Sequence, residues 1–210
     1  MTPVMYIDST SYTPEWLKWF SIGAAVLGVV LVVGAITVLT MGVGTTIMTT
    51  TMAGAVLHGA AVGTLIGAGV GVVAGAIIGD AVSDWSTEGI LIGMGIGFGS
   101  GALIGAIAGG ATGAISYTNA ANSWYGGKDA MISHFKNHAM QMGYKNPMQY
   151  TKGAKAIING GQYMTQTNAY MASVSGLKYA YVGVNQGGQL ITTFFYKTFT
   201  VSKALALGLL

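Results

Sequence analysis

The chain has 210 residues, of which 34 are Gly and only 7% are charged, against about 25% in an average soluble domain. It has no Cys and no Arg, which excludes a disulfide framework, a Cys-ligated zinc site and a Cys nucleophile. The charge is divided unevenly: residues 1–119 hold one Lys and five acids, net −4, whereas 120–210 hold eight Lys and one acid, net +7. The basic part predicts an anionic partner, which is nucleic acid, lipid head groups or an acidic protein.

The first apolar stretch runs from Ile22 to about Thr40 and is long enough to cross a hydrocarbon core as a helix. Trp16, Trp19 and Phe20 precede it and are typical of a membrane-interface collar. No basic segment precedes this stretch, as a secretory signal would require. We therefore expect a piece of a longer protein or the cargo of a dedicated exporter.

Two further apolar stretches carry Gly at every fourth residue. Because a four-residue step stays near one helix face, each run predicts a stripe without side chains, through which helices associate in lipid. We expect a hairpin of Met52–Ile78 and Gly89–Ile115 with the polar residues between them as its turn, and a membrane segment over residues 22–115. A buried hairpin in a soluble protein and a flexible spacer are the alternatives. The two runs are Gly59, Gly63, Gly67, Gly71, Gly75, Gly79 and Gly89, Gly93, Gly97, Gly101, Gly105, Gly109, Gly113.

The basic part begins with a predicted linker and two helices. Residues 119–128 are rich in Asn and Gly and predict the linker. Asp129 is the expected N-cap of a helix that ends near Met142, and Asn146-Pro147 opens a second helix that ends near Ile158.

Runs of β-favouring residues follow the helices. They predict antiparallel strands over 162–173, 177–184 and 189–199, with turns at Ser175-Gly176 and 185–188. Residues 202–210 receive no assignment. The fold class is therefore two-part: an all-α glycine-zipper segment (1–118), a linker (119–128) and a small α+β domain (129–210) with two helices and then an antiparallel sheet.

The basic domain holds residues suited to metal-independent RNA cleavage. That reaction needs a base for the 2′-hydroxyl, an acid for the leaving 5′-oxygen and donors for the phosphate. His134 and His138, one helical turn apart, fit the first two roles, and Lys178 and Thr193 are the candidates for the phosphate. Without a Glu between them, the two His do not form the zinc motif of a protease, and a structural role at a helix boundary is the alternative. We expect no metal and no cofactor.

Four further residues are expected to bind the RNA. Tyr179 and Tyr181 project to the same side of their strand, where they can stack bases. Lys136 and Lys155 are expected to contact the RNA as cations.

Several short motifs resemble the C-terminal nuclease domains of bacterial polymorphic toxins of the RHS and contact-dependent inhibition types. The motifs are His134-Phe-Lys-Asn-His138, Gly143-Tyr144, Tyr150, Ala154, Tyr179-Ala-Tyr-Val182 and Thr193-Phe-Phe195. The fold group is that of barnase, EndoU, the colicin tRNases and RelE, whose members cut RNA without a metal. The family typically has a Lys immediately before the second His, where this sequence has Asn137.

The resemblance implies a ribonuclease toxin, acting on tRNA or another RNA, that its zipper segment delivers. It further implies delivery from the cell surface or by secretion, membrane insertion, action in the target-cell cytoplasm and neutralisation by an immunity protein. By charge, that protein's binding surface is expected to be acidic. Two alternatives differ in class: a pore-forming, bacteriocin-like toxin in which the zipper hairpin itself kills, and a membrane scaffold without toxicity.

Overall fold

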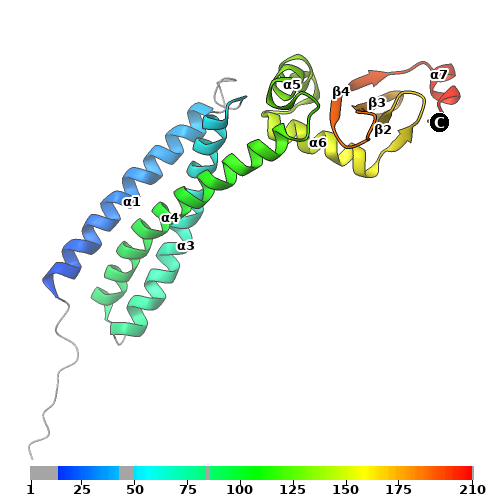
Figure 1. Cartoon of the computed structure of the whole chain (residues 1–210). Coiled ribbons are helices and arrows are strands. Elements are labelled where there is room, and N and C mark those ends of the chain that lie inside the picture. Colours follow the sequence, from blue (N-terminus) through cyan, green and yellow to red (C-terminus); the bar gives the residue numbers. More distant parts are fainter. Residues whose placement is uncertain (1–13, 43–49, 84–85, 210) are drawn as a thin grey trace, which may run out of the picture. The chain divides into compact units, whose positions relative to one another are not determined.

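A computed structural model describes residues 14–42, 50–83 and 86–209 (Figure 1). Three long apolar helices come first, and a small four-stranded antiparallel sheet lies toward the C-terminus. The contacts divide the chain into two compact units. The apolar unit comprises the described residues of 1–44 together with 56–113, and the basic unit comprises the described residues of 45–55 together with 114–210. The coarse two-part layout expected from the sequence is thereby confirmed.

The apolar unit is built from α1 (Glu15–Gly42), α3 (Met52–Ser83) and α4 (Thr87–Ala121). Each helix is long and apolar enough to cross a membrane. α3 and α4 form the expected hairpin, but both run past their predicted ends. Ser86 begins α4 by accepting a 3.0 Å hydrogen bond from the Gly89 amide, and so satisfies one of the free N–H groups at the helix start.

The two glycine stripes face each other along the whole hairpin. Every glycine of the α3 stripe lies so close to an α4 glycine that a Cβ added to it would overlap the partner's carbonyl oxygen. Such closeness allows Cα–H···O contacts between the two backbones and leaves no space for any side chain. The expected zipper is therefore a continuous antiparallel backbone contact. The facing pairs are Gly59–Gly109, Gly63–Gly105, Gly67–Gly101, Gly71–Gly97, Gly75–Gly93 and Gly79–Gly89.

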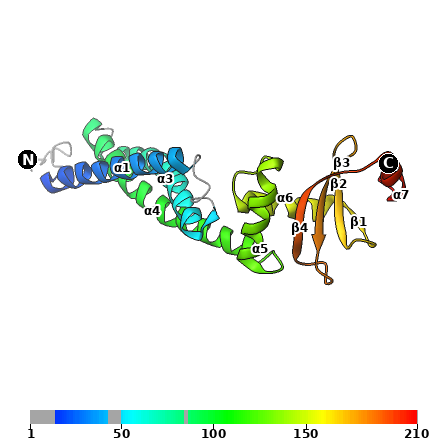
Figure 2. The same ribbon diagram turned by 90° about the horizontal axis from the view of Figure 1, so that it is seen from above.

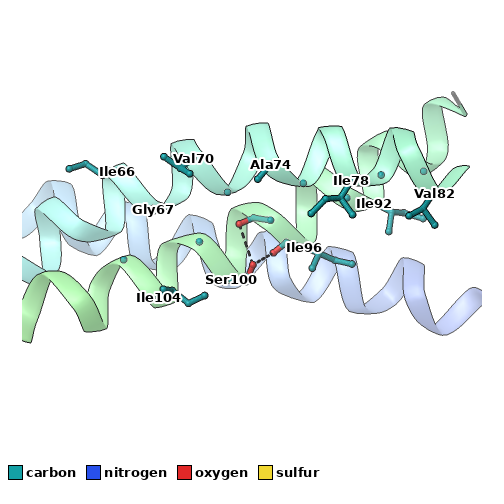
Figure 3. A pocket seen from close by; sticks show the side chains of 18 of the residues that line it. Ile66, Gly67, Val70, Ala74, Ile78, Val82, Ile92, Ile96, Ser100 and Ile104 are labelled. Atoms are coloured by element: carbon teal, nitrogen blue, oxygen red, sulfur yellow. Dashed lines mark hydrogen bonds between the residues drawn. The ribbon is translucent and has the colours of Figure 1, made fainter. Parts of the chain in front are cut away.

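An open groove follows one side of this contact (Figure 3). It has a volume of about 940 Å³, and branched aliphatic side chains from both helices flank it, including Ile66 of α3 and Ile104 of α4. The Ser100 hydroxyl at its wall donates to the Ile96 carbonyl of its own helix at 2.8 Å, so it offers little polarity to the groove. Ile66 is 62% and Ile104 is 65% exposed, which suits a lipid environment far better than water.

The helix α1 packs along α4 and runs in the same direction. A Cβ on Gly99 would overlap the Ala24 backbone, and the Ser21 hydroxyl donates to the Ile92 carbonyl at 3.1 Å. Where both helices begin, Lys18 Nζ lies 2.6 Å from Glu88 Oε1. The first turns of α1 and α4 therefore lie side by side at one end of the three-helix unit.

The basic unit packs its first helices against one face of the sheet. Its helical part comprises α5 (Gly127–His134), a π-helical turn (Phe135–Ala139), a 3₁₀ turn (Met140–Met142) and α6 (Pro147–Gly160). Four strands follow, β1 (Gln162–Met164), β2 (Ala169–Ser175), β3 (Lys178–Val184) and β4 (Ile191–Thr198), paired in that order (Figure 2). The short helix α7 (Val201–Ala206) occupies the segment left unassigned at 202–210.

Both faces of the sheet are covered by apolar contacts. The main core lies between the helices and the sheet and includes Trp124, Tyr150 and Phe194. Tyr179 and Ala204 belong to a second cluster, which α7 covers. Because side chains alternate along a strand, these two clusters occupy opposite faces.

One predicted helix cap is confirmed, another is wrong, and one predicted strand is interrupted by a turn. Asn146 caps α6, because its side chain accepts from the Gln149 amide at 2.8 Å. The expectation that Asp129 caps the preceding helix is wrong, since α5 begins two residues earlier, after Gly126 with φ 98°. The expected strand 162–173 is a hairpin of β1 and β2, broken where Asn168 adopts a positive φ of 48° and donates to the Val184 carbonyl.

The stretch 119–128, expected as a linker, packs into the core of the basic unit. α4 continues to Ala121, and Trp124 is only 2% exposed. The backbone on either side of Trp124 pairs with the edge of β4, since the Tyr125 amide donates to the Ile191 carbonyl and the Ile191 amide to the Ser123 carbonyl. The apolar side chains of residues 119–128 hold the segment in the core. The sequence prediction overlooked them because the segment is rich in Asn and Gly.

The backbone contact between α3 and α4 predicts different outcomes for two neighbouring glycines. Gly71→Ala forces the helices apart and should cost roughly 1–3 kcal/mol, as overpacking does. Gly69→Ala is the matched control, because no atom lies within 4 Å of its added Cβ. Ala should there leave stability unchanged or raise it by up to about 1 kcal/mol. Unfolding titrations of the purified protein in detergent micelles measure both; equal destabilisation by the two variants would contradict the zipper.

Candidate functional site

Two half-buried imidazoles lie side by side on the basic unit. His134 is the last residue of α5, and His138 lies in the π-helical turn that follows. The four-residue spacing puts both on one side of this helical segment. Their ring centroids are 5.9 Å apart, and the rings are stacked at 28°.

The imidazole pair occupies the middle of a row of aromatic rings. On one side His134 stacks on Trp124 at 5.3 Å, and on the other side His138 contacts Phe195 of β4 at 5.8 Å. Phe195 in turn stacks on Tyr181, its neighbour across the β3–β4 pair, at 5.0 Å. The row thus leads from the core to the half-buried rings of Phe195 and Tyr181 on the sheet.

The buried end of the row is firmly held. Trp124 Nε1 donates to the Thr151 hydroxyl at 2.8 Å, and both groups are buried. Tyr150 stacks on the Trp124 ring at 5.6 Å and donates a short hydrogen bond to the Phe194 carbonyl. Burial raises the pKa of Tyr150, so the phenol stays protonated and acts as a structural donor. These contacts fix the ring on which His134 rests.

The surroundings of His134 favour its neutral form by lowering its pKa. Burial lowers the pKa of its imidazole, and the neighbouring His138 lowers it further. Its Nδ1 is buried and has no hydrogen-bond partner among the described residues. A neutral imidazole at neutral pH is a competent proton acceptor.

Lys178 and Thr193, the expected phosphate-binding pair, lie at the start of β3 and in β4. Lys178 Nζ lies 4.6 Å from the centroid of the Tyr196 ring. Thr193 stands opposite Gly183 and fills the space that a side chain there would occupy. No hydrogen bond, ion pair or ring contact within the described part of the chain joins either residue to His134 or His138. The structure brings the two imidazoles together without these two partners.

The two tyrosines expected to stack bases, Tyr179 and Tyr181, differ in their exposure. Tyr179 is 3% exposed, packs against Phe199 and donates to the Leu209 carbonyl at 3.0 Å. The C-terminal segment thus covers it, and it is not available to a base in this structure. Tyr181 is half-buried, and Lys197 Nζ lies 5.7 Å from its ring centroid.

Sequence reasoning missed Trp124, Phe195 and Lys197. Trp124 lay in the segment interpreted as a linker. For Phe195 and Lys197 the available signal was the alternation of side chains along a strand, since residues two apart lie on the same face. Phe195 and Lys197 share a face of β4 with Thr193 and pair with Tyr181 and Tyr179 of β3.

None of the described lysines of the basic unit forms an ion pair. Lys136 and Lys155 are exposed. Among the described residues, the one ion pair is Lys18–Glu88, in the apolar unit. The described residues also contain no group of three His, Asp or Glu side chains placed to hold a metal ion.

No protein family model matches the chain, and no curated protein or solved structure is significantly similar to it. The function is therefore inferred from the residues themselves.

The lowered pKa of His134 has a measurable consequence. Its titration midpoint, followed by NMR of histidine-labelled full-length protein in micelles, should lie below the ordinary value of about 6.5. His138→Gln should raise that midpoint, but burial should still keep it below the ordinary value. A midpoint at or above 6.5 in the unsubstituted protein would contradict the buried, neutral imidazole.

The same shift links the stability of the basic unit to pH. The unfolded chain takes up the proton of His134 near pH 6.5, whereas the folded chain takes it up only at lower pH. The stabilising contribution is therefore complete above about pH 6.5 and decreases as the pH falls toward the folded midpoint.

Proposed function

We propose that this protein is a membrane-inserting toxin whose basic unit cleaves RNA without a metal ion. The observation that carries the proposal is the stacked pair His134–His138 beside the rings of Phe195 and Tyr181, on a unit of net charge +7. General acid–base chemistry supplies the reaction, and the free lysines supply the attraction for a polyanion.

In the proposed reaction His134, neutral at pH 7, accepts the proton of a ribose 2′-hydroxyl. The 2′-oxygen forms a bond to the adjacent phosphorus as the bond to the 5′-oxygen breaks. His138, in its protonated form, gives a proton to that leaving oxygen. The products are a 2′,3′-cyclic phosphate and a free 5′-hydroxyl, so atoms and charge balance without a co-reactant.

The surroundings of the pair support an unpaired RNA strand as substrate. Phe195 lies between His138 and Tyr181, so a base stacked on either ring lies close to the imidazoles. Lys197 lies near the Tyr181 ring and is exposed, so it would offer a cation to the phosphate of a nucleotide whose base stacks on that ring. No contact within the described residues joins Lys178 or Thr193 to the imidazoles, so the proposal gives these two residues no part in the reaction, and Lys136 and Lys155 contribute to the general attraction for RNA.

We assign the delivery of the basic unit into the target cell to the apolar unit. Its helices expose aliphatic side chains on most of their surface, and the proposed site lies outside them. We propose that the protein is released or presented by the producing cell, inserts into a target membrane, and acts on RNA in the target cytoplasm. A cognate immunity protein with an acidic surface would neutralise the exposed lysines.

A second function has its own support in the glycine contact. The α3–α4 hairpin is a closely packed apolar pair with a groove along its length, and together with α1 it provides three helices long enough to span the membrane. A hairpin of this kind can also disrupt a bilayer directly. In that case the lysines would bind anionic lipid instead of RNA.

Substitution of the three histidines separates the two functions. His134→Ala and His138→Ala in the full chain should each lower RNA cleavage roughly 10²–10⁴-fold, as loss of a general acid or base does, and should abolish growth inhibition on expression. His58→Ala is the matched control, because His58 is exposed on α3, and it should remain toxic. If both site variants stay fully toxic, the hairpin is the killing element and the nuclease proposal fails.

The chemistry is tested with a purified single-stranded RNA. Cleavage should persist in EDTA, leave a 2′,3′-cyclic phosphate and stop when the 2′-hydroxyl at the cut is replaced by hydrogen. Binding should weaken steeply with salt, because several lysines displace counterions. Cleavage that requires a divalent cation, or that proceeds on the 2′-deoxy strand, would contradict this mechanism.

A further inference from the structure

The three long helices have a fixed direction relative to one another. The Lys18–Glu88 ion pair and the Ser21–Ile92 hydrogen bond place the start of α1 beside the start of α4. The facing glycines then place the end of α3 at the same end, because α3 and α4 are antiparallel. One end of the apolar unit therefore holds the beginning of α1 and the α3–α4 turn, and the chain leaves through α4 at the other end.

The length of the glycine contact matches the thickness of a bilayer. From Gly59 to Gly79 the contact covers twenty residue steps, which at 1.5 Å per residue is about 30 Å, the depth of the hydrocarbon core. The last residues of α3, Asp80–Ser83, then lie at one interface. Trp16 and Trp19, 66% and 69% exposed near the start of α1, belong to the same end and suit the head-group level.

The charges at the two ends are opposite in sign. Among the described residues, the turn end holds three acids, Glu15, Asp80 and Glu88, and one Lys, and that Lys18 is already engaged by Glu88. The segment between α1 and α3, residues 43–51, has no charged residue. All eight remaining lysines follow α4, and Lys128 and Lys136 come within twenty residues of its end.

We infer that the apolar unit crosses a membrane three times in one orientation, with the start of α1, the end of α3 and the start of α4 outside and the lysine-rich unit in the cytoplasm. Lysines near the ends of spans are retained on the cytoplasmic side, whereas acidic residues do little to oppose translocation. The odd number of crossings puts the start of α1 and the lysine-rich unit on opposite sides. This orientation does not depend on what the basic unit does, and it holds for a nuclease and for a pore-forming protein alike.

Site-directed labelling tests the orientation directly, because the chain has no cysteine of its own. Three single-cysteine variants are made in the full-length protein with His134→Ala and His138→Ala added, so that host cells tolerate expression. Thr87→Cys reports on the turn, Ser202→Cys on the basic unit, and both positions are exposed. Ile104→Cys, exposed in the middle of the glycine contact, is the control for lipid burial.

A membrane-impermeant maleimide is applied to bacterial spheroplasts before and after permeabilisation. The expected result is that Thr87→Cys reacts from outside, that Ser202→Cys reacts only after permeabilisation, and that Ile104→Cys reacts in neither case until detergent dissolves the membrane. The reverse pattern, or equal reactivity of the first two variants in intact spheroplasts, would overturn the inference. Protection of both until permeabilisation would overturn it as well, since the turn would then not have crossed.

Discussion

The structure depends on the approach of two backbones, those of α3 and α4, along their glycine stripes. A glycine costs about 1 kcal/mol relative to Ala in a helix interior, so two helices with this many glycines need compensation from packing. The facing pairs provide it, because each glycine brings a carbonyl oxygen against the opposite backbone with no side chain between. The outward surface of the hairpin is left aliphatic, as in a helix pair that is apolar enough to span a membrane.

The same two helices also contribute to the basic unit. The beginning of α3 and the end of α4 belong to it, and the Tyr117 hydroxyl near the end of α4 donates to the Thr50 carbonyl at 3.1 Å. Trp124 comes three residues after the end of α4, and the His134 ring stacks on its indole. The position of the proposed acid–base pair is therefore set by where α4 ends, and a basic unit cut at residue 120 would lack Tyr117 and Ala55 from its core.

The sequence alone predicted those features that depend on local periodicity. The four-residue glycine spacing predicted the hairpin, and Asn146-Pro147 predicted the start of α6, because in both cases neighbouring residues decide the geometry. The site was predicted only in part. The adjacency of His134 and His138 follows from helical spacing, whereas the burial of Tyr179 under the last residues and the joining of Trp124 to β4 depend on contacts between distant segments. No local pattern in the sequence encodes such contacts.

The glycine contact is most directly tested by solid-state NMR of the full-length protein in lipid bilayers with carbon-13 at glycine only. The account predicts cross-peaks between Gly67 and Gly101 and between Gly71 and Gly97, residues far apart in the sequence whose backbones meet. Correlations confined to glycines of the same helix would contradict it, because the two stripes would then not face each other.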